Sequence, residues 1–346
     1  ITTSGKGGNF SLSVELVDFK AIDLDDPDGP VKVFGDVRFG GREGVTTTLA
    51  QDLEPEYGTV LNGHAYVTLQ ENNAVAKINL ENAAVVSIFG LGAVDYAEVA
   101  VDLSDNDKFD PEPDQEVLGL RMPDQIAAFT TSDGMEYFIT GNEGDAREYE
   151  GYVDEIRNRD LDNIYDLPGR LKLIANGNDP SQVLVNDGLT AFSFDDNSDG
   201  ADGTPYSLGS RSASIFSAED GTLVWDSWMT DTITDPITGV AINYNTSLQN
   251  IAAHAGVYPN IRSDDKGTEP EAVAAMKFQG QTYAVVGLER TTDGADGGGL
   301  LVVYNINNVQ DVDFVTYQPL NGFAPEGIEV IPPSLSATGR LLLGVS

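Results

Sequence analysis

The chain has 346 residues, of which 40% are hydrophobic and 22% are charged, a composition typical of a globular protein with ample material for a core. Its 56 acidic residues outnumber 19 basic ones, and the formal net charge of −37 repels nucleic-acid phosphates and anionic lipid surfaces while favouring cations. An acidic surface adapted to salty water would give the same excess. The absence of cysteine excludes disulfides, thiolate nucleophiles and Cys-zinc sites. No apolar run approaches the ~20 residues that a membrane-spanning helix needs.

Strand patterns dominate the chain from its N-terminal end onward. Residues 10–19 alternate apolar and polar with a period of two. Residues 213–218 and 222–226 flank an Asp-Gly turn and predict a hairpin, and residues 300–306 predict a further apolar strand. Glycines and prolines punctuate short runs throughout, and no segment keeps a 3.6-residue apolar stripe over a dozen residues. The pattern therefore predicts an all-β fold.

One phrase recurs four times along the chain. A proline is followed by an acid and an apolar run, and a second apolar run then ends in another acid. The first acids are Glu56, Asp124, Glu271 and Glu326, the second acids are Glu71, Glu143 and Glu289, and in the fourth copy Ser346 stands where the second acid is due. Internal repeats of this length indicate a repeat architecture. If the units pack radially, their acids converge, and converging carboxylates need a cation.

The spacing of these phrases favours a β-propeller of four-stranded blades. The longest interval between phrases has room for another unit, which we expect to be centred on the hairpin at 210–228. The chain would then hold roughly five units of about 50–70 residues, each suited to a four-stranded blade with insertion loops. A β-sandwich is the alternative, but it does not predict a repeated phrase.

Residues 195–200 carry the sharpest local motif. Asp195, Asn197 and Asp199 precede a glycine in the pattern D-x-N-x-D-G, which opens a calcium-binding loop because alternate oxygens turn inward. The glutamate expected at the twelfth position is replaced by Tyr206, so Asp202 would have to supply the missing oxygen. A solvated turn rich in Asp and Asn is the alternative interpretation.

Two further constellations combine acids with arginine or lysine. The first lies at 142–149 and the second at 262–271, where Glu289 and Arg290 are expected to join it. Carboxylates hold hard cations, which polarise phosphoryl oxygens, and guanidinium groups clamp the phosphate. These residues therefore suit metal-assisted hydrolysis of phosphoesters, and a salt-bridged network around a channel is the alternative. The two histidines lack the spacing of a zinc site or the elbow of a serine hydrolase.

Several of these phrases resemble the choice-of-anchor I family. They are the stretches 51–57, 66–75, 142–149, 262–267 and 325–327, and the likeness covers nearly the whole chain from about Ser11. The residues that match recurrent polar positions of the family are Glu56, Glu71, Asp124, Glu143, Asp145, Arg147, Asp264, Asp265, Glu271, Glu289, Arg290 and Glu326. The family consists of secreted or surface-attached bacterial β-propeller proteins, and some members carry alkaline-phosphatase or phytase-like labels.

The resemblance implies one β-propeller domain over residues 1–346, with seven blades in the intact protein. Family members carry further propeller sequence before the equivalent of Phe10 and beyond the equivalent of Ser346. We therefore expect this chain to lack N-terminal blades and the closing C-terminal strand. A companion fragment would then complete the propeller, because an open sheet edge is a liability for aggregation.

The leading functional hypothesis is a secreted or cell-surface bacterial enzyme that hydrolyses phosphoric esters with calcium, with a second divalent or transition metal left open. The residues expected to hold cations near the channel mouth are Glu143, Asp145, Glu271, Glu289 and Glu326, with Glu56, Glu71, Asp124, Asp264 and Asp265 as further metal ligands. Arg147, Lys266 and Arg290 would bind the phosphate of a small ester substrate.

The alternative is a non-catalytic surface or matrix module that calcium stiffens and that binds a surface partner. An esterase of the lactonase-like propeller type is a third hypothesis. Neither nucleic acid nor a membrane span is expected.

Overall fold

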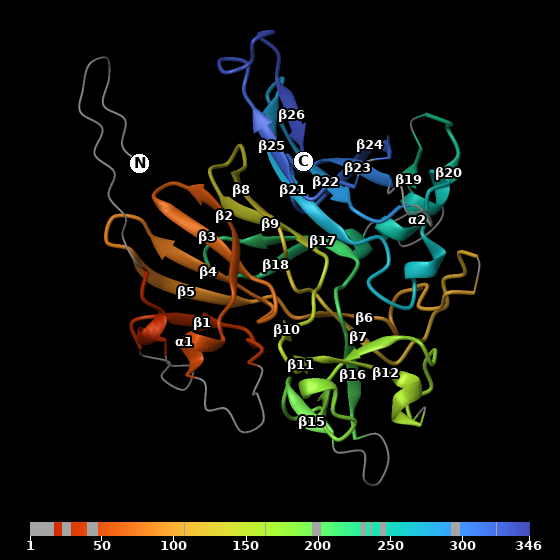
Figure 1. Ribbon diagram of the computed structural model, residues 1–346. Coiled ribbons are helices and arrows are strands. Elements are labelled where there is room, and N and C mark those ends of the chain that lie inside the picture. The colour runs from red at the N-terminus through yellow and green to blue at the C-terminus, as the bar shows by residue number, and fades with distance from the viewer. Residues whose placement is uncertain are drawn as a thin grey trace.

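The computed structural model describes residues 17–22, 29–39, 48–106, 108–162, 164–195, 202–229, 233–235, 237–242, 247–291, 298–322 and 324–346. The described part is all-β, as the sequence predicts, and its helices are short (Figure 1). The helices are α1 (Leu49–Asp52) and α2 (Leu248–His254), and the 3-10 turns are η1 (Phe19–Ala21), η2 (Asn158–Leu161), η3 (Asn176–Asn178), η4 (Ser227–Met229) and η5 (Asn260–Arg262). The predicted strand at 10–19 lies largely outside the described residues.

The first sheet, which we call the N-terminal sheet, has the strand order β1-β5-β4-β3-β2. Its strands are β1 (Lys32–Phe34), β2 (Pro55–Leu61), β3 (His64–Leu69), β4 (Ala74–Asn79) and β5 (Ala84–Gly90). The four strands from β2 to β5 form an antiparallel meander, and β1 adds to its outer edge in parallel. The turns between these strands are short and set the register of the pairing. The first repeated phrase therefore occupies one hairpin, formed by β2 and β3.

The second sheet, the middle sheet, has the order β18-β17-β9-β8 and corrects one expectation from the sequence. Its strands are β8 (Ile126–Thr130), β9 (Glu136–Asn142), β17 (Ser212–Ser217) and β18 (Leu223–Asp226). The predicted hairpin exists, but it is the outer half of the middle sheet and not the centre of a further unit. Residues 143–211 are inserted between β9 and β17, which separates the two halves of one sheet along the chain.

Five strands of the inserted stretch form a further sheet, the insertion sheet, with the path β12-β13-β16-β14-β15. Its strands are β12 (Glu155–Arg157), β13 (Lys172–Ile174), β14 (Val183–Asn186), β15 (Ser193–Asp195) and β16 (Thr204–Ser207), joined by β6 (Ala93–Asp95) and β7 (Leu118–Leu120) through β16. Two-stranded ribbons are formed by β10 (Glu148–Tyr149) with β11 (Tyr152–Val153) and by β19 (Ile233–Thr234) with β20 (Ala241–Ile242).

The third sheet is an antiparallel meander of β21 (Pro270–Phe278), β22 (Gln281–Leu288), β23 (Gly298–Asn305) and β24 (Asp313–Asn321). A C-terminal hairpin follows, formed by β25 (Ile328–Ile331) and β26 (Leu342–Val345). The first strands of the successive units, β2, β8, β21 and β25, pack against one another in that order. The sheets therefore follow each other in space as they do in sequence (Figure 1).

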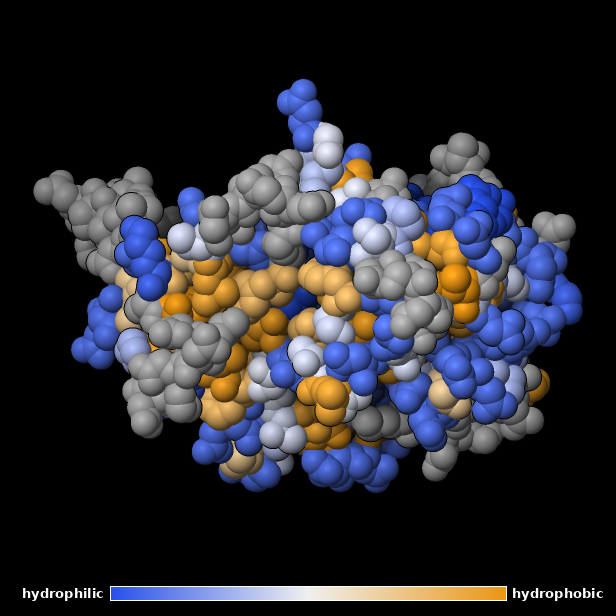
Figure 2. All heavy atoms as spheres, turned by 90° about the horizontal axis from the view of Figure 1, so that it is seen from below, coloured by the Kyte–Doolittle hydropathy of each residue, from blue (hydrophilic) through white to orange (hydrophobic). Residues whose placement is uncertain are grey.

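Apolar cores fill the spaces between these sheets. One cluster joins the middle and third sheets with α2, and another joins the N-terminal and middle sheets. In the latter, Phe138 stacks against Phe89 at 5.9 Å and against Phe216 at 5.3 Å between ring centroids. Seen from below, apolar residues gather on the left of the molecule, whereas hydrophilic side chains cover much of the right (Figure 2).

Replacing Phe138 by alanine should lower the free energy of unfolding by about 3–5 kcal/mol, because the ring is fully buried and leaves a cavity between two sheets. Urea unfolding of the variant measures this loss. Phe278→Ala is the matched control, since that ring is 46% exposed. Equal losses in the two variants would contradict the assignment of Phe138 to the core between the sheets.

Candidate functional site

The repeated phrase places its two acids at the same end of each of the three units that carry both. In each unit the first two strands are antiparallel, so the start of the first strand lies beside the end of the second. Pro55 of β2 pairs with Leu69 of β3, and Pro270 of β21 pairs with Leu288 of β22. The acids that follow these positions therefore gather at one edge of the packed sheets, as the sequence predicts.

Three of the predicted acids form a tight group, which we call the acidic trio: Glu143, Glu271 and Glu289. One carboxylate oxygen from each lies within 4.8 Å of the others. The side chains of Glu143 and Glu289 are mostly buried, and Glu271 is half-buried. Carboxylates this close and this shielded from water repel one another strongly unless protons or cations neutralise them.

The carboxyl groups of the trio have raised pKa values, so they keep their protons to a higher pH than ordinary glutamates do. Burial raises the pKa of Glu271 to about 10, with the charges of Glu143 and Glu289 adding to the effect. Burial also raises the pKa of Glu143 to about 7 and raises that of Glu289, although Lys266 and Arg290 respectively oppose the change. The protonated carboxyl of Glu271 donates a hydrogen bond to Glu289. A cation that bound here would displace these protons.

Asp124 and Glu56 form a second pair of acids beside the trio. Asp124 is 3% exposed, and its Oδ2 has no hydrogen-bond partner among the described residues. Burial, then the charges of Glu143 and Glu56 and a hydrogen bond to Glu56, raise the pKa of Asp124 to about 9. The pKa of Glu56 is also raised, mainly by burial. A buried carboxylate oxygen without a partner is costly, so this atom is suited to receive a cation.

Lys266 supplies the main positive charge inside this centre. Its ammonium forms an ion pair with Glu143 and lies 3.3 Å from Glu269 and 3.5 Å from Asp145. Burial alone would lower the pKa of Lys266, but the carboxylates, Glu143 first, outweigh it and raise the pKa. Lys266 therefore stays charged and is held by acids from two loops.

Arg290 lies at the more open side of the trio. Its Nη2 is 2.8 Å from Glu289 and its Nε is 3.9 Å from Glu269, and the side chain is 48% exposed. Part of the guanidinium can therefore meet a ligand from solvent while the rest remains paired with an acid.

Arg147 lies elsewhere, although the sequence groups it with Glu143 and Asp145. Its guanidinium is buried, 3.1 Å from Asp52 and 2.9 Å from Glu54, so it ties the insertion to the N-terminal sheet. The side chain of Asp145 is 59% exposed and lies 3.5 Å from the ammonium of Lys266. The structure thus separates Arg147 from the trio.

Glu71 occupies the space between these two regions. Burial raises its pKa to about 8, with the charges of Glu54 and Glu56 contributing, and its Oε2 has no hydrogen-bond partner among the described residues. The neighbouring Gln70 donates from Nε2 to Oε2 of Glu143 at 3.0 Å. Glu71 therefore borders the acidic centre without joining the trio.

The remaining predicted ligands lie outside the trio. Asp264 is buried in ion pairs with Arg157 and Arg170, at 2.7 and 3.1 Å. Asp265 pairs with Lys172 at 3.0 Å and with Arg262 at 3.1 Å. These two acids belong to the salt-bridged network that the sequence left open as an alternative.

Glu326, at the start of the C-terminal hairpin, is exposed. In the predicted calcium loop, Asp195 is buried and accepts hydrogen bonds from the hydroxyl of Tyr165 at 2.9 Å and from the backbone N–H of Asp202 at 3.0 Å. Asn197 and Asp199 lie outside the described residues, so calcium binding by this loop stays a prediction.

Glu269 belongs to the centre, although the sequence analysis placed it only within the constellation at 262–271 and did not select it as a site residue. It is 1% exposed and receives ion pairs from Arg262 and Lys266. The sequence does contain a pattern that could have identified Glu269, because Glu-Pro-Glu occurs at 54–56 as well as at 269–271. In both places the glutamate before the proline pairs with an arginine. The one after it belongs to the trio in the case of Glu271 and interacts with Asp124 in the case of Glu56.

The comparison with family models decides the family. The model of the choice-of-anchor I domain matches residues 3–309. The chain belongs to the choice-of-anchor I family. Membership in the choice-of-anchor I family indicates an extracellular, surface-associated domain of a bacterial protein. None of the described helices is long and apolar enough to cross a membrane.

A search of curated proteins gives no match. Similar solved structures include the WD40 repeats of RRP9, at 9% identity over 90% of this chain and 92% of that chain, with a TM-score of 0.22. Kuenenia stuttgartiensis hydrazine synthase matches at 11% identity over 96% and 99%, with a TM-score of 0.21. The structure of U3-55K matches at 9% identity over 90% and 91%, with a TM-score of 0.18. TM-scores this low do not establish a shared fold.

The raised pKa values predict that stability falls as pH rises when cations are removed. A carboxyl whose pKa is higher in the folded state binds more protons there than in the unfolded chain, so raising the pH favours unfolding. For Glu271 the window runs from its ordinary value of 4.5 to about 10. Melting temperatures measured in chelator across this range should decrease.

Glu271→Gln should make this decrease shallower, because a neutral amide replaces the titrating group. Glu81→Gln, at an exposed turn, should leave it unchanged. A melting temperature that does not depend on pH in the unsubstituted protein would show that the trio is not buried as described.

Proposed function

We propose that the acidic trio, with Asp124, binds a divalent cation, calcium in the first instance, and that this loaded centre hydrolyses phosphate monoesters at the bacterial cell surface. The observation that carries the proposal is the convergence of Glu143, Glu271 and Glu289, whose carboxylate oxygens lie within 4.8 Å of one another. The sheets are then blades of a β-propeller, with the trio at its channel mouth.

The spacing of these oxygens suits calcium. Oxygen ligands lie about 2.3–2.6 Å from Ca²⁺, so two oxygens on one ion are at most about 5 Å apart. The trio meets this limit, and the unpartnered Oδ2 of Asp124 provides a further buried oxygen near Glu143. An all-oxygen donor set favours calcium or magnesium over softer transition metals.

The residues around the trio have distinct roles in hydrolysis. A divalent ion here would supply Lewis-acid polarisation of the phosphoryl oxygen and of a water molecule. Arg290, half exposed beside Glu289, binds the phosphate oxygens and orients the ester. Lys266, which pairs with Glu143 and Glu269 in the absence of a cation, keeps a positive charge beside the loaded centre.

A second candidate function is a non-catalytic surface module in which the cation only stabilises the packing of the sheets. The pairing of the basic residues favours it. Of the three residues predicted to bind phosphate, Arg147 is buried among acids away from the trio and Lys266 is held by three carboxylates. Both functions require the cation, so they differ only in turnover and in anion binding.

Glu143→Gln tests the cation site. Since Glu143 is a proposed ligand, its loss should weaken calcium binding by more than the roughly 10–100-fold that residues supporting a ligand cost. Isothermal titration calorimetry measures the affinity, and calcium should raise the melting temperature of the unsubstituted protein far more than that of the variant. Glu81→Gln is the control. Equal calcium affinity in all three proteins would refute the proposed ligands.

Arg290→Gln separates the two candidate functions. If Arg290 binds phosphate, the variant should retain calcium binding but hydrolyse p-nitrophenyl phosphate with a KM raised roughly tenfold, which corresponds to about 1.4 kcal/mol. Arg159→Gln, at an exposed arginine of the insertion, should behave like the unsubstituted protein. Calcium-loaded protein that shows no turnover at alkaline pH would exclude the enzyme and leave the stabilising role.

A further inference from the structure

The loop at 263–269, which we call the lysine loop, joins η5 to β21 and brings Lys266 to Glu143. At its C-terminal end the loop is fastened to the third sheet, where the backbone N–H of Glu289 donates to the carbonyl oxygen of Glu269 at 2.9 Å. A loop fastened at this end alone would leave the ammonium of Lys266 free to move. A second attachment must therefore fix where the lysine lies.

The insertion supplies this second attachment at Asp264. The Asp264 side chain is buried, and its Oδ2 lies 2.7 Å from Nη1 of Arg157 and 3.1 Å from Nε of Arg170. The backbone N–H of Lys172, in β13, donates to the carbonyl oxygen of Asp264 at 3.1 Å. Both the side chain and the backbone of this residue are thus held by the insertion.

The next residue of the loop, Asp265, is held in the same way. Its carboxylate pairs with Lys172 at 3.0 Å, and its carbonyl oxygen accepts a hydrogen bond from Nη2 of the fully buried Arg211 at 2.9 Å. Four of the six basic residues of the insertion therefore contact two neighbouring acids of the lysine loop: Arg157, Arg170, Lys172 and Arg211. This concentration of charge indicates a specific attachment.

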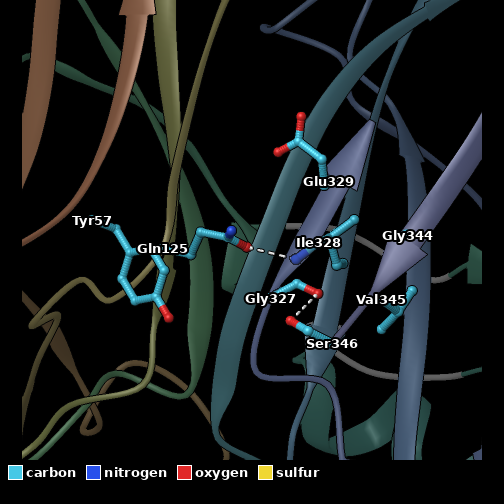
Figure 3. Close-up of a pocket in the computed structure, with 8 residues that line it drawn as sticks. All are labelled: Tyr57, Gln125, Gly327, Ile328, Glu329, Gly344, Val345 and Ser346. Atoms are coloured by element: carbon cyan, nitrogen blue, oxygen red, sulfur yellow. Dashed lines mark hydrogen bonds between the residues drawn. The ribbon is translucent and has the colours of Figure 1, made fainter. Parts of the chain in front are cut away.

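The acids of the trio do not need the insertion for their own positions, because they stand at the ends of paired strands. Gln125, just before β8, joins the neighbouring sheets. Its Oε1 accepts hydrogen bonds from the backbone N–H groups of Val273 at 2.7 Å and Ile328 at 3.2 Å, and Figure 3 shows its side chain reaching toward Ile328. The insertion is therefore required for the lysine and not for the acids.

We propose that the insertion is a clamp that holds Lys266 at Glu143, and that Asp264 is the positioning residue through which the clamp acts. Lys266 stands between the two attachments of the loop, and its ammonium also lies 3.3 Å from Glu269 and 3.5 Å from Asp145. A lysine side chain loses much conformational freedom when it is fixed, and a loop that is already fixed adds no further loss of backbone freedom to this cost.

This inference deepens the proposed function, because it names the residue that positions the positive charge of the same centre. The proposed function requires a cation at the trio, whereas the clamp holds the lysine in the protein without one. The two can therefore fail separately.

Acetylation of Lys266 by acetic anhydride tests the clamp in the full chain without a cation. Mass spectrometry of the digested protein gives the rate, which reports how often the amine leaves its acids. Asp264→Asn removes the charged partner of two guanidinium groups, and hydrogen bonds of this kind change a local opening equilibrium by at least about tenfold. Lys266 should be labelled faster by that factor. Lys77, whose Nζ donates to the carbonyl oxygen of Ala218 at 2.8 Å in another sheet, should keep its rate.

A second pair of substitutions removes the same contacts from the other side, since Asp264 is buried and its loss also lowers overall stability. Arg157→Gln combined with Arg170→Gln changes side chains that reach solvent, and it should also accelerate the labelling of Lys266. Arg157→Lys in place of Arg157→Gln keeps a positive charge and should restore slower labelling. Arg159→Gln, at an exposed arginine of η2, is the matched control.

Two labelling results would overturn the proposal. Equal acceleration at Lys77 would show that the substitutions loosen the whole fold, and an unchanged rate at Lys266 in both variants would show that the loop keeps its place without the insertion.

Calorimetric titration with calcium adds a readout whose sign is fixed. Lys266 competes with a cation for Glu143, so Asp264→Asn should raise the calcium affinity by freeing the lysine, whereas loosening of the centre would lower it. A lower affinity in Asp264→Asn would contradict the clamp. Absence of calcium binding in every protein would refute the proposed function alone, and the labelling rates would still decide whether the clamp exists.

Discussion

Repulsion among buried carboxylates is the constraint on which the rest of this structure depends. Two unit charges 4 Å apart repel by about 4 kcal/mol at an effective dielectric constant of 20, and the acidic trio packs three such groups together. Protons on Glu271, the ammonium of Lys266 and the guanidinium of Arg290 each relieve part of this repulsion. Asp124, whose pKa is raised to about 9, also keeps its proton near neutral pH, so a cation would neutralise this centre by displacing these protons.

The backbone enforces this proximity. The acids cannot separate without opening the sheets, because each sits at the end of an antiparallel strand pair whose neighbours are fixed. Gly141 is decisive, since its missing side chain allows β21 to approach β9 closely enough for Glu271 to meet Glu143. The electrostatic repulsion among the acids destabilises the native fold. The burial of the apolar cores between the sheets offsets this destabilisation.

The sequence predicts the local units well because their signal is local. A proline, an acid and two apolar runs define a hairpin, and antiparallel pairing then brings both acids to one edge. The hairpin at 213–226 was assigned to a separate unit because β9 and β17, although paired, are separated by 69 inserted residues. Pairing over such a distance leaves no periodic trace in the sequence.

The same difference between local and long-range signals explains which residues of the candidate site the sequence could predict. The sequence predicts the convergence of Glu143, Glu271 and Glu289 because the strand pattern fixes where they lie. Arg147 was grouped with Glu143 by sequence proximity, but it lies beyond the end of β9, where the path of the insertion and not the strand decides its direction. Its partners, Asp52 and Glu54, come from another unit, so only tertiary packing could place it.

The arrangement of the basic residues bears on what a cation would do here. Lys266 is held by acids on two loops, so a cation that took Glu143 from it would leave its ammonium partly unpaired beside the centre. A buried ammonium without a partner is costly, and an anion arriving from solvent would restore its pairing. Cation and anion binding would then be coupled through Glu143, and a centre loaded with a cation would favour a phosphate ester that the empty centre repels.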